Sequence, residues 1–146
     1  MNAQLGKNTK ITVATPYASG TSAVNSTVLD MSGWDGVVCV YTMAAITGGA
    51  ATSVKWQQGT DGTVSDAADL LGTSITIADS DDDELFIMDL YKPLERYVRT
   101  VISKATQAAG ASAMYIQYRG SKAPIDNSVT GESTYELHIS PAEGTA

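Results

Sequence analysis

The chain has very little of the chemistry that enzymes use. Its 146 residues include one histidine, His138, and one cysteine, Cys39. A standard zinc site takes three or four ligands, and one of each type is too few to supply it. No Gly-x-Ser-x-Gly motif, which would place a serine nucleophile on a sharp turn, precedes His138. The sequence therefore predicts that the protein is not an enzyme, with no catalytic, metal-binding or cofactor-binding residues and no cofactor.

Positive charge is also scarce. Charged residues make up 17% of the chain, the formal net charge is −7, and the sequence pI is about 4.4. Nucleic-acid binders carry a basic stripe, and binding to an anionic membrane uses a polybasic segment. We therefore expect neither nucleic acid nor membrane as a partner. A single cysteine cannot form an internal disulfide, and Cys39 lies in an apolar run, which predicts a small buried residue.

Long hydrophobic runs are missing as well. No stretch approaches the ~20 apolar residues of a membrane span, and residues 1–8 lack the apolar core of a signal peptide. We expect the protein to be made in the cytoplasm of its host cell and used without secretion. Residues 1–8 are polar, and their composition suits a flexible N-terminal arm.

The chain does contain many short segments of strand-like sequence, separated by Gly, Asn, Asp and Ser. Apolar and polar residues alternate in several of them, which is the period of a half-buried strand. The most apolar segment, 37–43, is expected at the centre of a sheet because it has no proline or charge. The expected strands are residues 10–15, 22–31, 37–43, 53–58, 75–77, 85–91, 97–103, 114–119 and 135–139.

This pattern predicts one all-β domain over residues 1–146, an antiparallel β-sandwich that is jelly-roll-like, with at most one short helix. The helix-like piece is 65–71, where Ser65 is placed as an N-cap and Gly72 as the end. The side chains expected to point inward are Val13, Val38, Val40, Trp56, Phe86, Met88, Ile102, Ile116 and Leu137.

The acidic run 79–84 invites comparison with a calcium loop. Asp79, Asp81 and Asp83 have the alternate spacing with which such a loop begins. However, Glu84 stands at the sixth position, which needs glycine, and Leu90 stands at the twelfth, which needs glutamate. We interpret the run as a solvated loop.

Aromatic residues leave a carbohydrate-binding module open as an alternative function. The chain has two tryptophans, Trp34 and Trp56, and seven tyrosines. Aromatics exposed together on one strand face would favour a sugar platform. Trp56 is expected in the core, because Val54 shares its strand face.

Two segments resemble small structural proteins of tailed bacteriophages. The first is 85–99, in which a strand ends in a Tyr-Lys-Pro-x-x-Arg-Tyr-x-Arg turn, and the second is the ending 136–146, with a Ser-Pro-x-Glu-Gly-like tail. Residues 34–37 and 66–73 also look similar. The likeness spans most of residues 30–146, and the proteins most like this chain are head decoration, or capsid cement, proteins.

The resemblance implies a bacteriophage virion protein that stabilises the icosahedral head. Such proteins bind the outer surface of the capsid lattice, commonly as trimers, so the implied partners are the major capsid protein and two further copies of this chain. The implied location is the capsid exterior of the virion. A phage tail or neck structural protein is the first alternative, and the carbohydrate-binding module is the second.

The segment 91–99 is our expected interface. It concentrates Tyr91, Arg96, Tyr97 and Arg99, and tyrosine and arginine are enriched at protein interfaces. The opposing interpretation is a solvated hairpin end.

Overall fold

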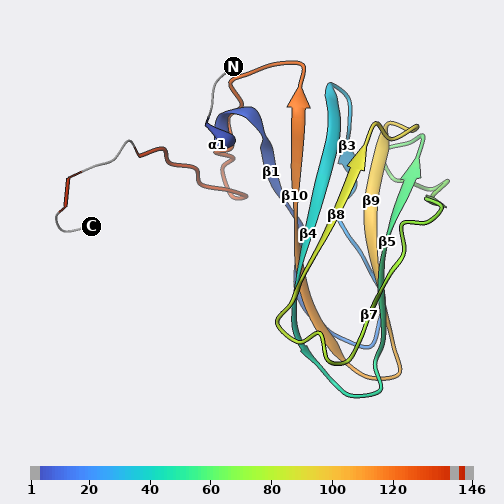
Figure 1. The fold of residues 1–146 in the computed structure, drawn as a ribbon. Coiled ribbons are helices and arrows are strands. Elements are labelled where there is room, and N and C mark those ends of the chain that lie inside the picture. Colours follow the sequence, from blue (N-terminus) through green and yellow to red (C-terminus); the bar gives the residue numbers. More distant parts are fainter. Residues whose placement is uncertain (1–3, 139–141, 144–146) are drawn as a thin grey trace.

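The computed structural model describes residues 4–138 and 142–143, and its body is two antiparallel sheets packed face to face (Figure 1). Sheet A contains, in spatial order, β1 (Lys10–Gly20), β10 (Ala109–Gly120), β4 (Trp34–Ile46) and β8 (Leu85–Tyr91). Sheet B contains, along its main path, β2 (Val24–Asn25), β9 (Tyr97–Ala105), β5 (Ala51–Gly59) and β6 (Ala68–Asp69). Two short strands complete sheet B: β3 (Leu29–Asp30) pairs with β9, and β7 (Ile75–Ile77) pairs with β5.

The order of the strands is that of a jelly roll. Along the chain the strands pass back and forth between the two sheets, and the first strand lies beside the last. If β2 with β3, and β6 with β7, each count as one strand position, two four-stranded sheets interleave in the manner of a double Greek key. The prediction of an all-β antiparallel sandwich, jelly-roll-like, is confirmed.

The described residues contain one helical turn, and it is not where we expected a helix. α1 covers Leu5–Asn8, whereas residues 65–71 form turns followed by β6, so the prediction of a helix there is wrong. The Asp61 carboxylate accepts hydrogen bonds from Thr63 N (2.7 Å) and from the Ser65 hydroxyl. These local bonds satisfy the backbone in a turn and compete with a helix. No helix in the described part of the chain is long and apolar enough to cross a membrane.

Residues 4–8 are held against the sandwich. The Asn127 side chain donates from Nδ2 to the carbonyl oxygens of Gly6 (2.7 Å) and Thr9 (2.9 Å). Lys7 Nζ lies 5.0 Å from the centre of the Tyr135 ring. Of the arm expected at residues 1–8, residues 1–3 lie outside the described residues, and the remainder packs beside β1 and β10.

The core fills the space between the sheets with large side chains. The Trp56 ring from sheet B stacks on the Tyr115 ring from sheet A, with 5.9 Å between ring centres. The predictions that Trp56, Met88 and Ile102 point inward are confirmed, and Phe86 is half-buried against the same core. Other fully buried residues are Val37, Cys39, Tyr41, Val54 and Val98.

Five of the expected core positions are wrong. In β4 the buried residues are Val37, Cys39 and Tyr41, so Val38 and Val40 lie on the opposite face. In β10 Tyr115 is buried and Ile116 is on the outer face. Val13 is exposed beside a register shift in β1. Leu137 is exposed because residues 134–138 form no strand, so the last expected strand is wrong over those residues.

A cluster of hydroxyl groups lies inside the apolar core. Ser26 Oγ is within hydrogen-bonding distance of Thr15 Oγ1 (2.7 Å) and Thr100 Oγ1 (2.8 Å). The Tyr115 hydroxyl accepts a hydrogen bond from Thr100 N at 3.0 Å. Because each hydroxyl has partners, the cluster ties the sheets together without leaving these groups unsatisfied.

Candidate interaction surfaces

The expected interface residues lie at one end of the sandwich but on two different sheets. Tyr91 ends β8 in sheet A, and Tyr97 and Arg99 belong to β9 in sheet B. The connection 92–96 crosses from one sheet to the other at the upper end in Figure 1. The four residues therefore lie in or beside one connection, but their side chains have three different sets of neighbours.

Arg96 holds the connection to β3. Its Nε and Nη2 donate to the two carboxylate oxygens of Asp30, at 2.9 and 2.7 Å. The guanidinium also lies over the Tyr97 ring, 5.1 Å from its centre. The hydrogen bond from Arg96 lowers the pKa of Asp30, and the same pairing raises the pKa of Arg96. A bidentate pair of this kind fixes the geometry of both side chains.

Arg99 belongs to a polar network on the outer face of sheet B. Its Nε donates to Gln57 Oε1 at 2.9 Å, and Gln57 Nε2 donates to Asp69 at 2.8 Å. Lys55 Nζ also donates to Asp69, at 2.6 Å. Hydrogen bonds from Lys55 and then Gln57 lower the pKa of Asp69. This face of the sandwich is hydrophilic.

Tyr91 contacts two cations at the upper end of sheet A. Arg119 lies 5.8 Å from its ring centre and Lys92 lies 5.4 Å from it. Arg119 also forms an ion pair with Asp35, with Nε 3.3 Å from Oδ2. We did not predict a role for Arg119 from the sequence, because it lies far along the chain from Tyr91.

A shallow cleft of about 310 Å³ lies beside the same connection. It runs between residues 31–35 and residues 92–96. Trp34 is half-buried at one side, and Leu94, at the tip of the connection, is 90% exposed. An exposed leucine beside an aromatic ring gives this end of the molecule an apolar contact point among its charges.

The outer face of sheet A carries a row of apolar side chains across all four strands. Val13 is paired with Met114, Met114 with Val40, and Val40 with Ile87. Val13 is 54%, Met114 44% and Ile87 63% exposed. An antiparallel sheet with one face in water ordinarily alternates apolar residues inside with polar residues outside. Sheet A departs from that pattern.

More apolar residues flank the row on the same face. Ile11 pairs with Ile116, Ile116 with Val38, and the exposed Leu85 pairs with Thr42 of β4. We call the set the sheet A patch: Ile11, Val13, Val38, Val40, Leu85, Ile87, Met114 and Ile116. The sequence could have indicated this patch through the uninterrupted apolar run 85–88. A strand with such a run has apolar residues on both of its faces.

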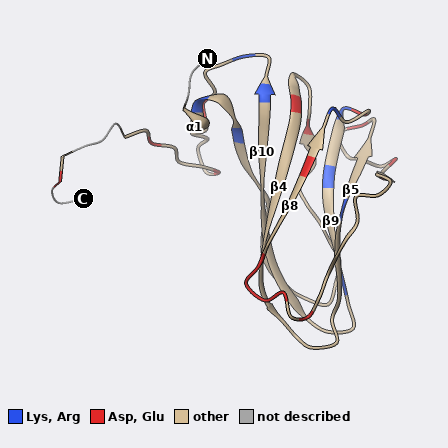
Figure 2. Cartoon of the chain, viewed as in Figure 1, with Lys and Arg blue, Asp and Glu red and all other residues tan. Residues whose placement is uncertain are grey.

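The acidic run lies at the opposite end of β8 from Tyr91 (Figure 2). Several of its carboxylates hold the turn. Asp82 Oδ1 accepts from Ile46 N (2.6 Å), Asp79 Oδ2 from Gly49 N (2.5 Å), and Asp81 Oδ2 from Ala78 N (2.8 Å). Among the described residues no group of three or more His, Cys, Asp or Glu side chains is arranged to hold a metal ion.

The single cysteine and the single histidine have different surroundings, one in the core and the other on the surface. Cys39 is fully buried beside Thr100, and burial raises the pKa of its thiol to about 12. His138 is exposed, with Nε2 3.1 Å from Glu136 Oε2. The structure does not bring the two side chains together into a nucleophile and base.

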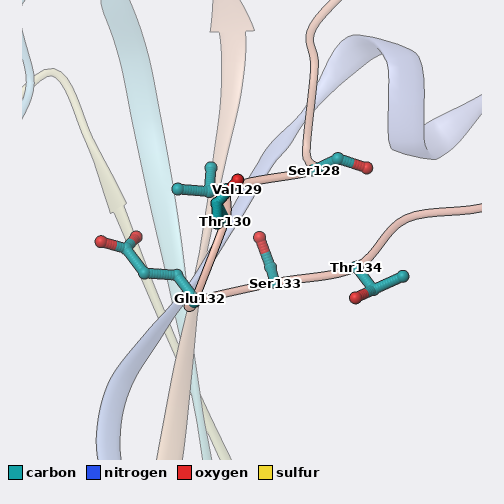
Figure 3. Close-up of a pocket in the computed structure, with 7 residues that line it drawn as sticks. Ser128, Val129, Thr130, Glu132, Ser133 and Thr134 are labelled. Atoms are coloured by element: carbon teal, nitrogen blue, oxygen red, sulfur yellow. The ribbon is translucent and has the colours of Figure 1, made fainter.

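A second hollow is formed by the turn 128–134 and measures about 470 Å³ (Figure 3). Backbone bonds between Val129 and Ser133 close this turn, at 2.9 Å in each direction. Its lining is Ser128, Val129, Thr130, Gly131, Glu132, Ser133 and Thr134, in which Glu132 is the one ionisable side chain. One carboxylate among hydroxyl groups supplies no acid–base pair.

Comparison with known proteins gives a distant likeness in fold and no family. No family model matches the chain, and no curated protein matches it. One similar solved structure comes from Bacillus endospore appendages, described as a novel family of disulfide-linked pili. It is 16% identical, with 81% of this chain and 96% of that chain covered and a TM-score of 0.44.

Proposed function

We propose that this chain is a non-enzymatic structural protein of a tailed-bacteriophage virion, which binds the outside of the capsid as a homotrimer and stabilises the head. The observation that carries the proposal is the segment 91–99, whose sequence resembles that of capsid decoration proteins. At the end of a jelly roll it presents the exposed Leu94 and the pair of Arg96 and Tyr97, and its Tyr91 lies beside Arg119 of β10. Jelly rolls are used by viral capsid domains and by lectins.

The proposed mechanism is clamping of an assembled lattice. The ion pair of Arg96 with Asp30 fixes the connection before binding, so little side-chain entropy is lost when the capsid is engaged. One copy makes a small contact with the major capsid protein. Three joined copies gain avidity because each later contact is intramolecular. A ligand that binds the intact shell and not its separated subunits stabilises the shell by mass action.

The test is genome release from capsids with and without this protein. Purified bare particles are saturated with the protein, heated in steps, and assayed for nuclease-accessible DNA. We expect decorated particles to release DNA at a higher temperature. Equal release from decorated and bare particles, together with failure to co-sediment with capsids, would refute the decoration function. That result would favour a tail or neck protein, which electron microscopy of the virion distinguishes.

The contact region is tested by substitution. Leu94→Ser and Tyr97→Ala remove exposed or half-exposed side chains of the connection, and we expect each to weaken co-sedimentation with capsids by tenfold or more, as at an interface hot spot. The matched control is Leu71→Ser, because Leu71 is fully exposed but lies in the turn after β6. Unchanged binding by Leu94→Ser, Tyr97→Ala and Arg99→Ala would show that the connection is a solvated hairpin end.

The carbohydrate-binding alternative receives less support. Trp56 is buried in the core, and the exposed tyrosines on sheet A, Tyr17 and Tyr91, lie near opposite ends of the sheet. Binding of the protein to a glycan array would support the carbohydrate-binding alternative.

A further inference from the structure

The sheet A patch is a contiguous apolar surface that crosses all four strands of the sheet. Its most exposed members, at 44–63% exposed, are Val13, Leu85, Ile87 and Met114. Contiguous exposed apolar patches mark sites of protein–protein contact. A standard interface buries about 800 Å² on each partner, and the patch with the residues at its rim would form the centre of such a contact.

The charge on this face favours another copy of the same chain as the occupant. Between the end of the sheet that holds Arg119 and the end that holds the acidic run, Asp89 is the one charged side chain on the outer face of the described strands. It accepts a hydrogen bond from the Tyr118 hydroxyl at 2.7 Å. Recognition of a foreign partner ordinarily uses complementary charges across the interface. Interfaces between identical copies are more apolar than interfaces between different proteins, and a nearly uncharged apolar face suits such a contact.

The two ends of the patch differ in shape. At the β8 end, Leu85 and Ile87 are 59% and 63% exposed. At the β1 end lies a hollow of about 620 Å³. Ile11, Val13 and Met114 line it, together with residues 27–29 and the turn 131–133, which includes Glu132. Exposed side chains and a hollow at opposite ends of one face define a heterologous contact, which closes into a ring when the rotation between copies permits.

We propose that Leu85 and Ile87 of one copy seat in the hollow beside Val13 and Met114 of the next copy, and that this contact repeats around a ring. The inference deepens the homotrimer of the proposed function and rests on it. It leaves the connection 91–99, at the end of the sandwich, free to face the capsid lattice.

The first test is the mass of the protein in solution by light scattering. We expect three times the 15.3 kDa chain mass for the natural sequence, and loss of the oligomer for Ile87→Glu and for Val13→Lys. Thr76→Glu is the matched control, because Thr76 is an exposed strand residue on sheet B. The double variant Ile87→Glu/Val13→Lys should recover the oligomer, since the two new charges attract across the contact. A monomeric natural protein at its highest soluble concentration, or an unaffected Ile87→Glu, would overturn the inference.

The second test identifies which residues meet. Val13 and Ile87 are separated by three strand spacings, or ~14 Å, too far for a disulfide within one chain. The double variant Val13→Cys/Ile87→Cys should therefore give covalent trimers on oxidation, while the buried Cys39 does not react. Equally efficient cross-linking of Ile87→Cys alone would mean that identical ends meet, and would overturn the proposed pairing.

Capsid binding is measured separately for the same variants. A monomeric natural protein that still co-sediments with capsids refutes this contact and leaves the decoration function standing. A trimer that does not bind capsids supports this contact and refutes the decoration function.

Discussion

The hydroxyl of Tyr41 on sheet A lies 2.8 Å from Oγ1 of Thr100 on sheet B, in the middle of the core. Ser26 Oγ lies 3.1 Å from the same tyrosine hydroxyl, so each polar group has a partner. Burial raises the pKa of Tyr41, which keeps the phenol neutral. The contact sets how the sheets face each other, because a shift would leave buried hydroxyl groups unpaired.

Thr100→Val should destabilise the fold. The substitution keeps the shape of the side chain but removes the oxygen that lies within hydrogen-bonding distance of both Tyr41 and Ser26, and each hydrogen bond lost costs about 0.5–1.5 kcal/mol. The measurement is the free energy of unfolding in urea. Thr76→Val, on the exposed side of β7, is the control and should stay within about 0.5 kcal/mol of the natural protein. Equal stability of the two variants would contradict the role given to the cluster.

The pair of Asp30 and Arg96 should make stability depend on acid pH. The pKa of Asp30 is lower in the folded protein than in the unfolded chain, so the pair stabilises the fold at pH values above the unfolded value of about 3.9. That contribution is lost as the pH falls through the folded pKa. Unfolding midpoints of the natural protein and Asp30→Asn should therefore differ at pH 6 and converge toward pH 2. Because both groups are largely exposed, the difference should be small and should shrink in 1 M salt.

Gly36→Ala tests a close approach on the outer face of sheet A. A methyl group at residue 36 would overlap the ring of Tyr118, and displacing that ring breaks its hydrogen bond to Asp89. We expect a loss of about 1–3 kcal/mol, as for other overpacked sites. In the background of Tyr118→Ala the same substitution should cost much less, which is a double-mutant cycle. Additive losses would show that the ring is not what excludes the methyl group.

Cys39 should be inert until the protein unfolds. Its thiol is fully buried and burial raises its pKa to about 12, and the thiolate is the reactive form. A thiol reagent at pH 8 should label the native protein negligibly and the urea-unfolded protein completely. Rapid labelling of the native protein would mean that the core opens at this point.

The sequence predicted the architecture well because turn residues mark nearly every strand end. It could not predict the facing of β4, because residues 37–41 are apolar on both faces and alternation gives no signal there. The structure explains why: Val38 and Val40 belong to the sheet A patch, while Cys39 and Tyr41 belong to the core. Val13 and Ile116 lie in segments that do alternate, but there the apolar set faces outward into the sheet A patch, while Tyr115 and Gln117 of β10 face the core.

The interface prediction shows a different limit. The sequence alone shows that the four expected interface residues lie close together in the chain: Tyr91, Arg96, Tyr97 and Arg99. Their partners Arg119, Asp30 and Gln57 come from other strands, and pairing across a sandwich cannot be read from one segment. The helix expected at 65–71 failed because the side chain of Asp61, placed before it, satisfies the backbone locally.

The adjacency of β1 and β10 has a consequence for synthesis of the chain. Lys10 pairs with Gln117 and Gly20 with Ala109, so the first strand leaves the ribosome roughly a hundred residues before its neighbour exists. At a translation rate of about 5–20 residues per second, the delay between synthesis of β1 and of β10 is on the order of ten seconds. During that interval Val13 and Ile11 have no sheet to join, and long-range pairing of this kind is slow even in the finished chain. Premature termination before residue 109 would leave β1 and β4 without the strand that lies between them, and such fragments should be cleared by host proteases.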